Sequence, residues 1–212
     1  MVSTQNGPST PKGWHPSRWR GDTPTTVAPS RARASSPTRD RPARILFVNQ
    51  YYWPDHASTA QHLCDLTEWL AAQGHECHVV CSQGGYKPGT KKPPREQARN
   101  GVKIHRIPAT ALGRRSTLRR MADYLSFFAG AVTRCLGLGR FDLVVTLTTP
   151  PLIGLIGTIL RTFRGSQHIA WSMDLHPDAS IALGRMSPRN PVVAALSKLS
   201  DLVLRRADRV VE

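Results

Sequence analysis

Five residues that could take part in proton transfer lie in two short stretches of the chain. They are Asp55 and His56 in the first stretch, and Asp174, His176 and Asp178 in the second. Asp174 directly follows an apolar run, and burial there could perturb the pKa of its carboxyl group and suit it to handle protons. A structural role is the alternative, because an aspartate at this position can also cap a turn through its side chain. His176 stands before Pro177 and could likewise be a turn residue.

The spacing of these residues fits no recognised metal site. The histidines and aspartates do not follow a known metal-ligand pattern, so we expect no bound metal. The sequence also lacks the G-x-S-x-G, G-x-x-x-x-G-K and G-x-G-x-x-G motifs. The absence of the last motif removes the main support for dinucleotide binding.

Residues Arg44–Ser82 predict a strand–helix–strand unit that would position the first stretch. Ile45–Val48 is a short apolar run typical of a strand, and Glu76–Cys81 is a second such run. Between them, Gln50–Ala57 holds aromatic and turn-forming residues, which suit a loop. The crossover between the two runs predicts that their strands are parallel and adjacent.

The helix of this unit is expected to begin at Ser58 and to end at Gly74. Ser58 can cap the helix, and Gln61 three residues later completes a capping-box pattern. Gly74 suits the left-handed position that closes a helix. The unpaired N–H groups at the helix N-terminus can receive a phosphate, although a plain amphipathic helix would show the same pattern. The apolar stripe is formed by Leu63, Leu66 and Leu70.

The rest of the chain alternates strand-like runs with amphipathic segments. Gln83–Gly101 is expected to be a loop, and the period-two pattern of Val102–Ile107 indicates an edge or half-exposed strand. At least five strands alternating with helices predict an α/β protein with a parallel sheet covered on both faces. The further expected strands are Phe141–Leu147, His168–Met173 and Asp208–Val211, and the further helices are Thr117–Cys135, Leu152–Phe163 and Pro191–Arg206. The loops expected at the carboxyl ends of the strands, where ligands bind, are Gln50–Ala57, Ser82–Tyr86, Thr148–Pro151 and Asp174–Asp178.

The expected helix Thr117–Cys135 has a basic end. Its approach and first turn carry four arginines, Arg114, Arg115, Arg119 and Arg120. Its apolar face is expected to comprise Leu118, Met121, Leu125, Phe128 and Val132. Basic residues at one end of an amphipathic segment favour attachment to an anionic membrane surface. A helix that packs on the sheet with a solvated basic end would show the same pattern.

The first 42 residues differ in composition from the rest. Ser, Thr, Pro and Arg dominate them, so they cannot bury enough apolar surface to offset the entropy of ordering. We therefore expect a disordered tail at residues 1–42 and a folded domain at residues 43–212. The tail has no apolar segment of the kind found in a secretory signal. The tail has a net charge of +5 and the remainder +10, which favours anionic partners such as nucleotides, lipid headgroups or nucleic acid.

Two further patterns concern the cell compartment and the membrane. The four cysteines, Cys64, Cys77, Cys81 and Cys135, form no C-x-x-C motif. Cys77 and Cys81 fall on one face of an expected buried strand, where a reduced cysteine behaves as a small hydrophobe, and this indicates a reducing compartment. The uncharged run between Asp142 and Arg161 reaches the lower limit for a membrane span. Paired prolines divide that run into a strand and a helix, so we reject a transmembrane span.

Several segments resemble one enzyme family, in the same order along the chain. The run FVNQYYWPDHASTAQHLCDLTEWLAAQGHECHVVCSQGGY closely resembles the opening of bacterial family-4 glycosyltransferases. The nearest branch builds capsular, colanic-acid-like and O-antigen polysaccharides. The segments FDLVVTLTTPPLIG, IAWSMDLHPDASIALG and LSDLVLRRADRVVE resemble the same branch. The resemblance covers about Arg44–Glu212, and several segments in register make it more specific than any single motif.

This resemblance implies the GT-B fold, in which two Rossmann-like domains face each other across a cleft. The chain would be the N-terminal, acceptor-side half, a doubly wound parallel sheet. The family transfers a sugar from a nucleotide sugar to a lipid-linked or saccharide acceptor, with retention of anomeric configuration and without a metal ion or other cofactor. The resemblance places the protein in the cytoplasm, as a peripheral protein on the inner face of the cytoplasmic membrane.

The resemblance also implies roles for particular residues. Asp174 is the best candidate for a group that faces the reaction centre, followed by His176. Where the family often has two glycines beside the donor phosphates, this chain has Ala57 and Ser58. The loop that would face substrate phosphate comprises Asp55, His56, Ala57, Ser58 and Thr59, and the acceptor-side loops would contribute Thr148, Thr149 and Asp178.

The end of the sequence bears on activity. The expected strand Asp208–Val211 stops at the last residues, and the family carries its paired glutamates and basic residue for the sugar nucleotide in a second domain. We therefore expect a chain that is truncated before the donor domain and inactive without it. One alternative is a binding module that holds the lipid-linked acceptor or pairs with a separate donor domain. A nucleic-acid binder is a further alternative, disfavoured because positive charge is its sole support.

Overall fold

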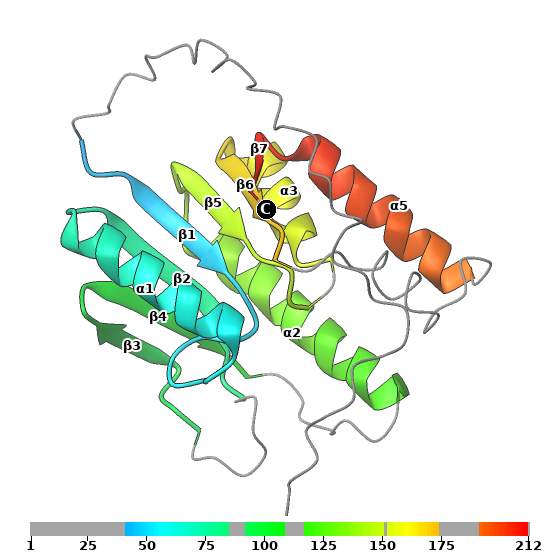
Figure 1. Cartoon of the computed structure of the whole chain (residues 1–212), viewed down its shortest axis with the longest axis horizontal. Coiled ribbons are helices and arrows are strands. Elements are labelled where there is room, and N and C mark those ends of the chain that lie inside the picture. The colour runs from blue at the N-terminus through cyan, green and yellow to red at the C-terminus, as the bar shows by residue number, and fades with distance from the viewer. Residues whose placement is uncertain (1–40, 85–91, 109–116, 151, 174–190, 212) are drawn as a thin grey trace, which may run out of the picture. The chain divides into compact units, whose positions relative to one another are not determined.

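The computed structural model describes residues 41–84, 92–108, 117–150, 152–173 and 191–211. All of them belong to one compact unit, Arg39–Glu212, and the predicted disordered tail lies almost wholly outside the described residues. The unit is built on a seven-stranded sheet in the order β3-β4-β2-β1-β5-β6-β7 (Figure 1). The strands are β1 (Arg44–Val48), β2 (Glu76–Ser82), β3 (Glu96–Arg99), β4 (Val102–Ile107), β5 (Leu143–Thr146), β6 (Gln167–Trp171) and β7 (Arg209–Val211). The helices are α1 (Ser58–Ala72), α2 (Thr117–Gly137), α3 (Gly154–Arg164) and α5 (Pro191–Arg206).

The sheet is parallel, as predicted, apart from the pairing of β3 with β4. The chain runs from β1 outward to β2 and β4, then crosses to β5 on the other side of β1 and continues to β6 and β7. The direction of winding therefore reverses between β1 and β5. Open α/β sheets bind ligands at such a switch point, beyond the carboxyl ends of the strands.

Each face of the sheet carries its own hydrophobic core. Side chains alternate along a strand, so Phe47 of β1 lies in one core and Leu46 in the other. The Phe47 core includes Leu63 of α1, whereas the Leu46 core includes Phe127 of α2 and Leu160 of α3. The predicted covering of both faces by helices is confirmed (Figure 1).

Helix α1 ends as predicted but begins differently. Gly74 follows the helix with a φ of 89°, the left-handed conformation expected at this position. At the other end Ala57 is the N-cap, Ser58 is the first helical residue, and no side chain caps the helix. Gln61 Nε2 donates to the His56 carbonyl oxygen at 3.2 Å rather than to the cap. The predicted capping box is therefore wrong, because the chain enters the helix one residue earlier.

The region expected to be a loop contains the edge strand β3. This strand pairs with β4 through a turn at Asn100 and Gly101, whose φ angles are 46° and 82°. Positive φ at both central residues is the hairpin turn that Asn-Gly favours. Strand β4 is therefore interior and mostly buried, contrary to the predicted edge or half-exposed strand, and it buries the polar side chains of His105 and Arg106.

The predicted apolar face of α2 is correct over its C-terminal half alone. Met121 and Leu125, which we placed on an apolar face that packs on the sheet or meets a membrane, are 46% and 65% exposed. Figure 1 shows that the N-terminal half of α2 extends beyond the strands, so no sheet surface lies beneath it. The α2 residues that pack against the core are Phe127, Phe128, Ala131, Val132 and Cys135.

The cysteines and the rejected membrane span agree with the sequence analysis. All four cysteines are free thiols, and burial raises the pKa of Cys77 to about 11 and that of Cys81 to about 12. These two thiols therefore remain protonated and pack as apolar groups. Within the described ranges, no helix is both long and apolar enough to cross a membrane.

Candidate functional site

The loops that follow β1, β2 and β5 meet at one residue, Gln50. Its backbone N–H donates to the Thr149 carbonyl oxygen at 2.9 Å, and its carbonyl oxygen accepts from the Ser82 N–H at 2.9 Å. Ser82 ends β2, and Thr149 lies in the loop after β5. The structure thus brings together three loops that the sequence predicts at the carboxyl edge of the sheet.

Three side-chain oxygens at this junction are buried without a hydrogen-bond partner among the described residues. They are Asn49 Oδ1, Gln50 Oε1 and Thr148 Oγ1. Asn49 is fully buried, and its Nδ2 donates to the Tyr51 carbonyl oxygen at 2.8 Å, which identifies Oδ1 as the unpartnered atom. An unsatisfied buried polar group costs about 1–3 kcal/mol, so water or a ligand is needed to complete the hydrogen bonding of these three oxygens.

Asn49 and Gln50 are not among the predicted site residues, although Gln50 begins the predicted ligand-binding loop Gln50–Ala57. The signal was available, because both residues directly follow the apolar run of β1 and therefore stand at the carboxyl end of a buried strand. What sequence reasoning lacked was the contact with the loop after β5, which converts one polar loop end into a cluster.

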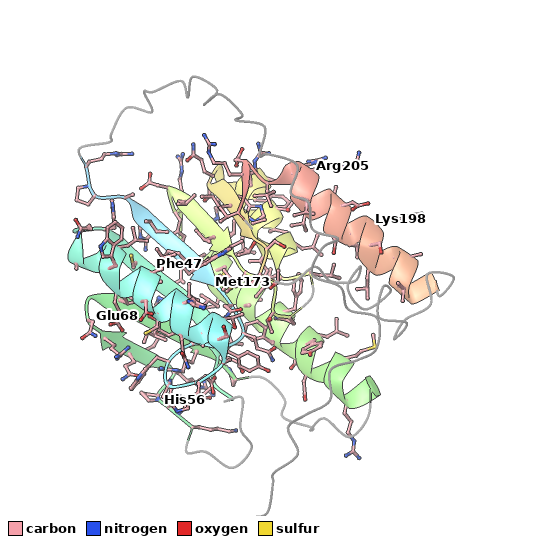
Figure 2. All side chains as sticks on the ribbon, in the orientation of Figure 1. Phe47, His56, Glu68, Met173, Lys198 and Arg205 are labelled. Carbon is pink, nitrogen blue, oxygen red and sulfur yellow. The ribbon has the colours of Figure 1, made fainter. Side chains whose placement is uncertain are left out.

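The residues predicted to face phosphate lie on the β1–α1 loop and the first turn of α1. The N–H groups of Ala60 and Gln61 donate to the Ala57 carbonyl oxygen, at 2.9 and 3.1 Å. The N–H groups before them have no partner within the helix, as helix geometry dictates. His56 (Figure 2) and Ser58 are exposed, whereas Asp55, Ala57 and Thr59 are partly buried.

A buried arginine on β4 holds this loop. Arg106 is 3% exposed and donates through Nη2 to the Trp53 carbonyl oxygen at 2.9 Å. Its Nη1 donates to the Pro94 carbonyl oxygen at 3.0 Å and to Gln97 Oε1 at 2.9 Å. Arginine remains protonated in proteins, so Arg106 both fixes the β1–α1 loop against β3 and keeps a positive charge beneath it.

The same loop is anchored to α1 by a hydroxyl pair. The Tyr52 hydroxyl lies 2.7 Å from Thr67 Oγ1, and Thr67 Oγ1 donates to the Cys64 carbonyl oxygen at 3.1 Å. Burial raises the pKa of the Tyr52 hydroxyl well above its ordinary value, so it remains protonated. The loop that carries the residues predicted to face phosphate is therefore held from two sides.

The residues that the resemblance marks most strongly fall outside the described part of the chain. Asp174, His176 and Asp178 all lie there, and so do Arg114 and Arg115. Arg119 is exposed, whereas the side chain of Arg120 is also outside the described set. The last described residue before Asp174 is Met173, which packs against the core that contains Phe47 (Figure 2). The chain therefore enters the Asp174 stretch from the carboxyl edge of the sheet.

Two other unpartnered atoms lie on or just before β6, outside the loops that meet at Gln50. Ser166 Oγ and His168 Nδ1 are buried at the amino end of β6 and have no partner within the described residues. His168 Nε2 lies 2.9 Å from Thr146 Oγ1. Burial lowers the pKa of His168 to about 4, so its ring is neutral. A neutral ring that donates through Nε2 leaves Nδ1 as a bare lone pair, which fits a structural role.

One family profile and two solved structures are similar to this chain. The profile of the Glycosyl transferase 4-like domain family matches residues 58–211. Sucrose-phosphate synthase from Thermosynechococcus elongatus has a TM-score of 0.55 and 15% identity, with 79% of this chain and 41% of the synthase chain covered. The calicheamicin glycosyltransferase CalG4 has a TM-score of 0.43 and 18% identity, with coverage of 79% and 42%. No curated protein is similar enough in sequence to count as a relative.

The chain belongs to the Glycosyl transferase 4-like domain family. Its sheet is the Rossmann-like N-terminal half of the GT-B glycosyltransferase fold, as the resemblance implied. The chain spans about two fifths of the length of the synthase chain that it matches.

Proposed function

We propose that this chain is the acceptor-side domain of a retaining glycosyltransferase. The enzyme moves a sugar from a nucleotide sugar to a lipid-linked or saccharide acceptor in surface polysaccharide synthesis. Membership of the glycosyltransferase family supports sugar transfer, and the resemblance of four sequence segments to the polysaccharide branch supports the acceptor class. The observation that carries the site is the group of unpartnered oxygens at the switch point, on Asn49, Gln50 and Thr148.

The chemistry of these oxygens favours a sugar as their ligand. A carboxamide oxygen accepts hydrogen bonds and never donates them, so Asn49 and Gln50 suit ligand hydroxyl groups better than phosphate oxygens. The N-terminus of α1 has the opposite character, because its unpaired N–H groups attract anions. We therefore assign acceptor hydroxyls to the side of Gln50 and Thr148, and the donor diphosphate to the side of Ser58.

A donor-binding domain is needed to complete this site. Catalysis of this kind stabilises a departing nucleotide diphosphate and aligns an acceptor hydroxyl, and both require groups on the two sides of a cleft. We propose that the chain works with such a domain, either linked to it or separate, without a metal ion, and that it transfers no sugar alone. A binding module for the acceptor is the alternative, and it would bind saccharide yet remain inactive with any donor domain.

Attachment to an anionic membrane forms part of the proposal. Arg119 is exposed on α2, and the neighbouring apolar side chains of Met121 and Leu125 are exposed on the same half of the helix. Apolar and basic side chains together favour an anionic bilayer surface. Docking through Arg114, Arg115, Arg119 and Arg120 on the inner face of the cytoplasmic membrane would bring the domain to a lipid-linked acceptor.

Sugar transfer by a completed enzyme tests the proposed activity. The chain is fused to a donor domain of the same family and assayed with a panel of nucleotide sugars and with saccharides on lipid diphosphates. We expect transfer with retained anomeric configuration by the fusion, and none by either half alone. If the fusion binds nucleotide sugar and saccharide but transfers nothing to any acceptor, the binding-module alternative is correct.

Sedimentation with lipid vesicles tests the membrane surface. Replacing the four arginines around the start of α2 by glutamine is expected to abolish sedimentation with anionic vesicles at low salt, because each contributes about 1 kcal/mol near such a surface. The control variant removes the same charge from α5 and β7 by replacing Lys198, Arg205, Arg206 and Arg209, all exposed, and should still sediment (Figure 2). Equal behaviour of the two variants would mean that α2 is no membrane anchor.

A further inference from the structure

Two buried histidines on neighbouring strands join two glutamates through a continuous chain of contacts. His78 of β2 and His105 of β4 are 3% and 6% exposed. His78 Nδ1 lies 2.9 Å from His105 Nε2. The outer nitrogens face carboxylates: His78 Nε2 lies 2.9 Å from Glu76 Oε1, and His105 Nδ1 lies 2.6 Å from Glu96 Oε2. All the ring nitrogens of the pair are therefore engaged.

The number of protons on the two histidine rings follows from the hydrogen bonds that link Glu76, His78, His105 and Glu96. An ionised carboxylate only accepts hydrogen bonds, so His78 Nε2 and His105 Nδ1 must both carry protons. The contact between the two rings needs one more. All three contacts together therefore need three ring protons. Two neutral imidazoles carry only a single proton each, so the histidine pair holds one additional proton and bears one positive charge. A further proton would set two N–H groups against each other between the rings.

The two ends of this chain of hydrogen bonds, at Glu76 and Glu96, reach charged groups at the surface. Glu76 also contacts Lys103 Nζ at 2.7 Å and Arg44 Nε at 3.2 Å. The side chains of Glu76 and Glu96 are 41% and 55% exposed, so protons can pass between solvent and the buried rings at either end. Burial lowers the pKa of both histidines, and the adjacent carboxylates oppose that shift. Arg44 and Lys103 hold Glu76 in place whether or not the histidine pair carries its additional proton.

The Glu96 end has a competing donor on α2. Arg134 Nη2 lies 2.5 Å from Glu96 Oε1 and 3.0 Å from His105 Nδ1. A guanidinium group only donates, so its contact with His105 Nδ1 becomes a hydrogen bond when that nitrogen has lost its proton. Glu96 Oε2 then faces a bare nitrogen lone pair at 2.6 Å, which is repulsive, and must move away. Glu96 and His105 are directly opposed in the pairing of β3 with β4.

We propose that His78 and His105 form a one-proton switch that couples the edge strand β3 to helix α2. With the additional proton, His105 donates to Glu96 and fastens β3 to β4. Without it, His105 accepts from Arg134, so β3 loses its side-chain link to β4 and keeps the contact of Glu96 with Arg134 on α2. The proton comes from solvent and returns to solvent, and no other group changes its charge.

Side-chain nitrogen NMR of the full chain between pH 5 and 8 tests the proposal without any substitution in the measured protein. His78→Gln and His105→Gln spectra serve to assign the rings. We expect His78 to keep its Nε2 proton throughout, and both rings to report a single shared titration in which His105 Nδ1 loses its proton as pH rises. Separate titration of each ring to its own cation would overturn the proposal. So would a His105 Nδ1 that carries no proton at any pH in this range.

Charge variants and hydrogen exchange sharpen the test. Glu96→Gln is expected to lower the midpoint of the shared titration by about one pH unit, because the carboxylate charge stabilises the cation. Arg134→Gln should raise it, whereas Arg119→Gln, at the far end of α2, should leave it unchanged. Amide exchange of Glu96–Arg99, corrected for the intrinsic effect of pH, should quicken above the midpoint while that of β1 does not. A corrected exchange rate in β3 that is the same below and above the midpoint would refute the coupling to the edge strand.

Discussion

Buried polar groups are satisfied in one part of the sheet and left unsatisfied in another. Around β2, β3 and β4, each buried histidine or arginine nitrogen discussed above has a partner, on His78, His105 and Arg106. At the carboxyl ends of β1 and β5, three side-chain oxygens lack one among the described residues, on Asn49, Gln50 and Thr148. The first group stabilises the fold, whereas the second has the unused hydrogen-bonding capacity that the proposed function assigns to a ligand.

One buried side chain, His168, does not fit this division between the two regions. His168 is completely buried at the amino end of β6, outside the loops that meet at Gln50, and its Nδ1 lacks a partner in the described structure. If an unpartnered atom by itself marked a binding site, this histidine would mark one. Its low pKa and its contact with Thr146 favour a structural role instead. Location at the switch point is therefore part of the argument for Asn49 and Gln50.

The largest expected effect is on turnover, at the edge of the sheet assigned to function. In the completed enzyme, Asp174→Asn should reduce turnover by about 10²-fold or more if the carboxylate aligns or deprotonates the acceptor hydroxyl. Stability should hardly change, because asparagine keeps the capping geometry of aspartate. Steady-state kinetics and urea unfolding of both proteins provide the measurement. Full turnover in the variant, or loss of folding, would return Asp174 to the role of a turn cap.

The next effect is on stability and tests the exception. The pKa of His168 is about 4 in the folded protein and near 6.5 when unfolded, so the unfolded state alone binds this proton between those values. The contribution of this group to stability is therefore lost as pH falls below about 6.5. The loss in the free energy of unfolding reaches about 2–3 kcal/mol at pH 4.5. Urea unfolding at pH 7 and 4.5 should show a smaller pH dependence in His168→Gln than in the parent. An unchanged difference between the two pH values would mean that His168 is accessible and not structural.

The smallest effect compares two threonines, one from each class of site. Thr67 is fully buried, and its hydroxyl bonds to Tyr52 and to the Cys64 carbonyl oxygen. Thr67→Val should lower the free energy of unfolding by about 1–2 kcal/mol, because it leaves partners unsatisfied. Thr148→Val removes a hydroxyl without a described partner, so stability should change by less than about 0.5 kcal/mol while turnover of the completed enzyme falls about tenfold. Equal losses of stability in both variants would erase the distinction between the two regions.

Local signals predicted most of the fold. The helix Pro191–Arg206 was predicted with the bounds that the structure has, and β1, β2 and β6 differ by one or two residues at their ends. The Asn100-Gly101 turn was an equally local signal, but the Lys- and Pro-rich segment before it concealed a strand of four residues. The face of α2 was not predictable in this way, because its apolar stripe continues beyond the end of the sheet that it covers.

The candidate site was predicted as a set of loops, without the atoms that define it. Thr148 and Thr149 were expected at the carboxyl edge, and the structure joins their loop to Gln50. Asn49 was missed, since nothing in its sequence neighbourhood reveals that its side-chain oxygen lacks a partner. Asp174 remains a prediction from resemblance.

The sequence by itself determined the alternation of strands and helices apart from β3, the closure of α1 at Gly74 and membership of the glycosyltransferase family. Tertiary structure alone decided which buried polar groups have partners. His78 and His105 are 27 residues apart and meet because β2 pairs with β4. The physical reason is the sequence separation of the residues involved, because apolar periodicity depends on residues close together along the chain. The partner of a buried hydrogen-bonding group comes from whichever distant segment the fold brings beside it.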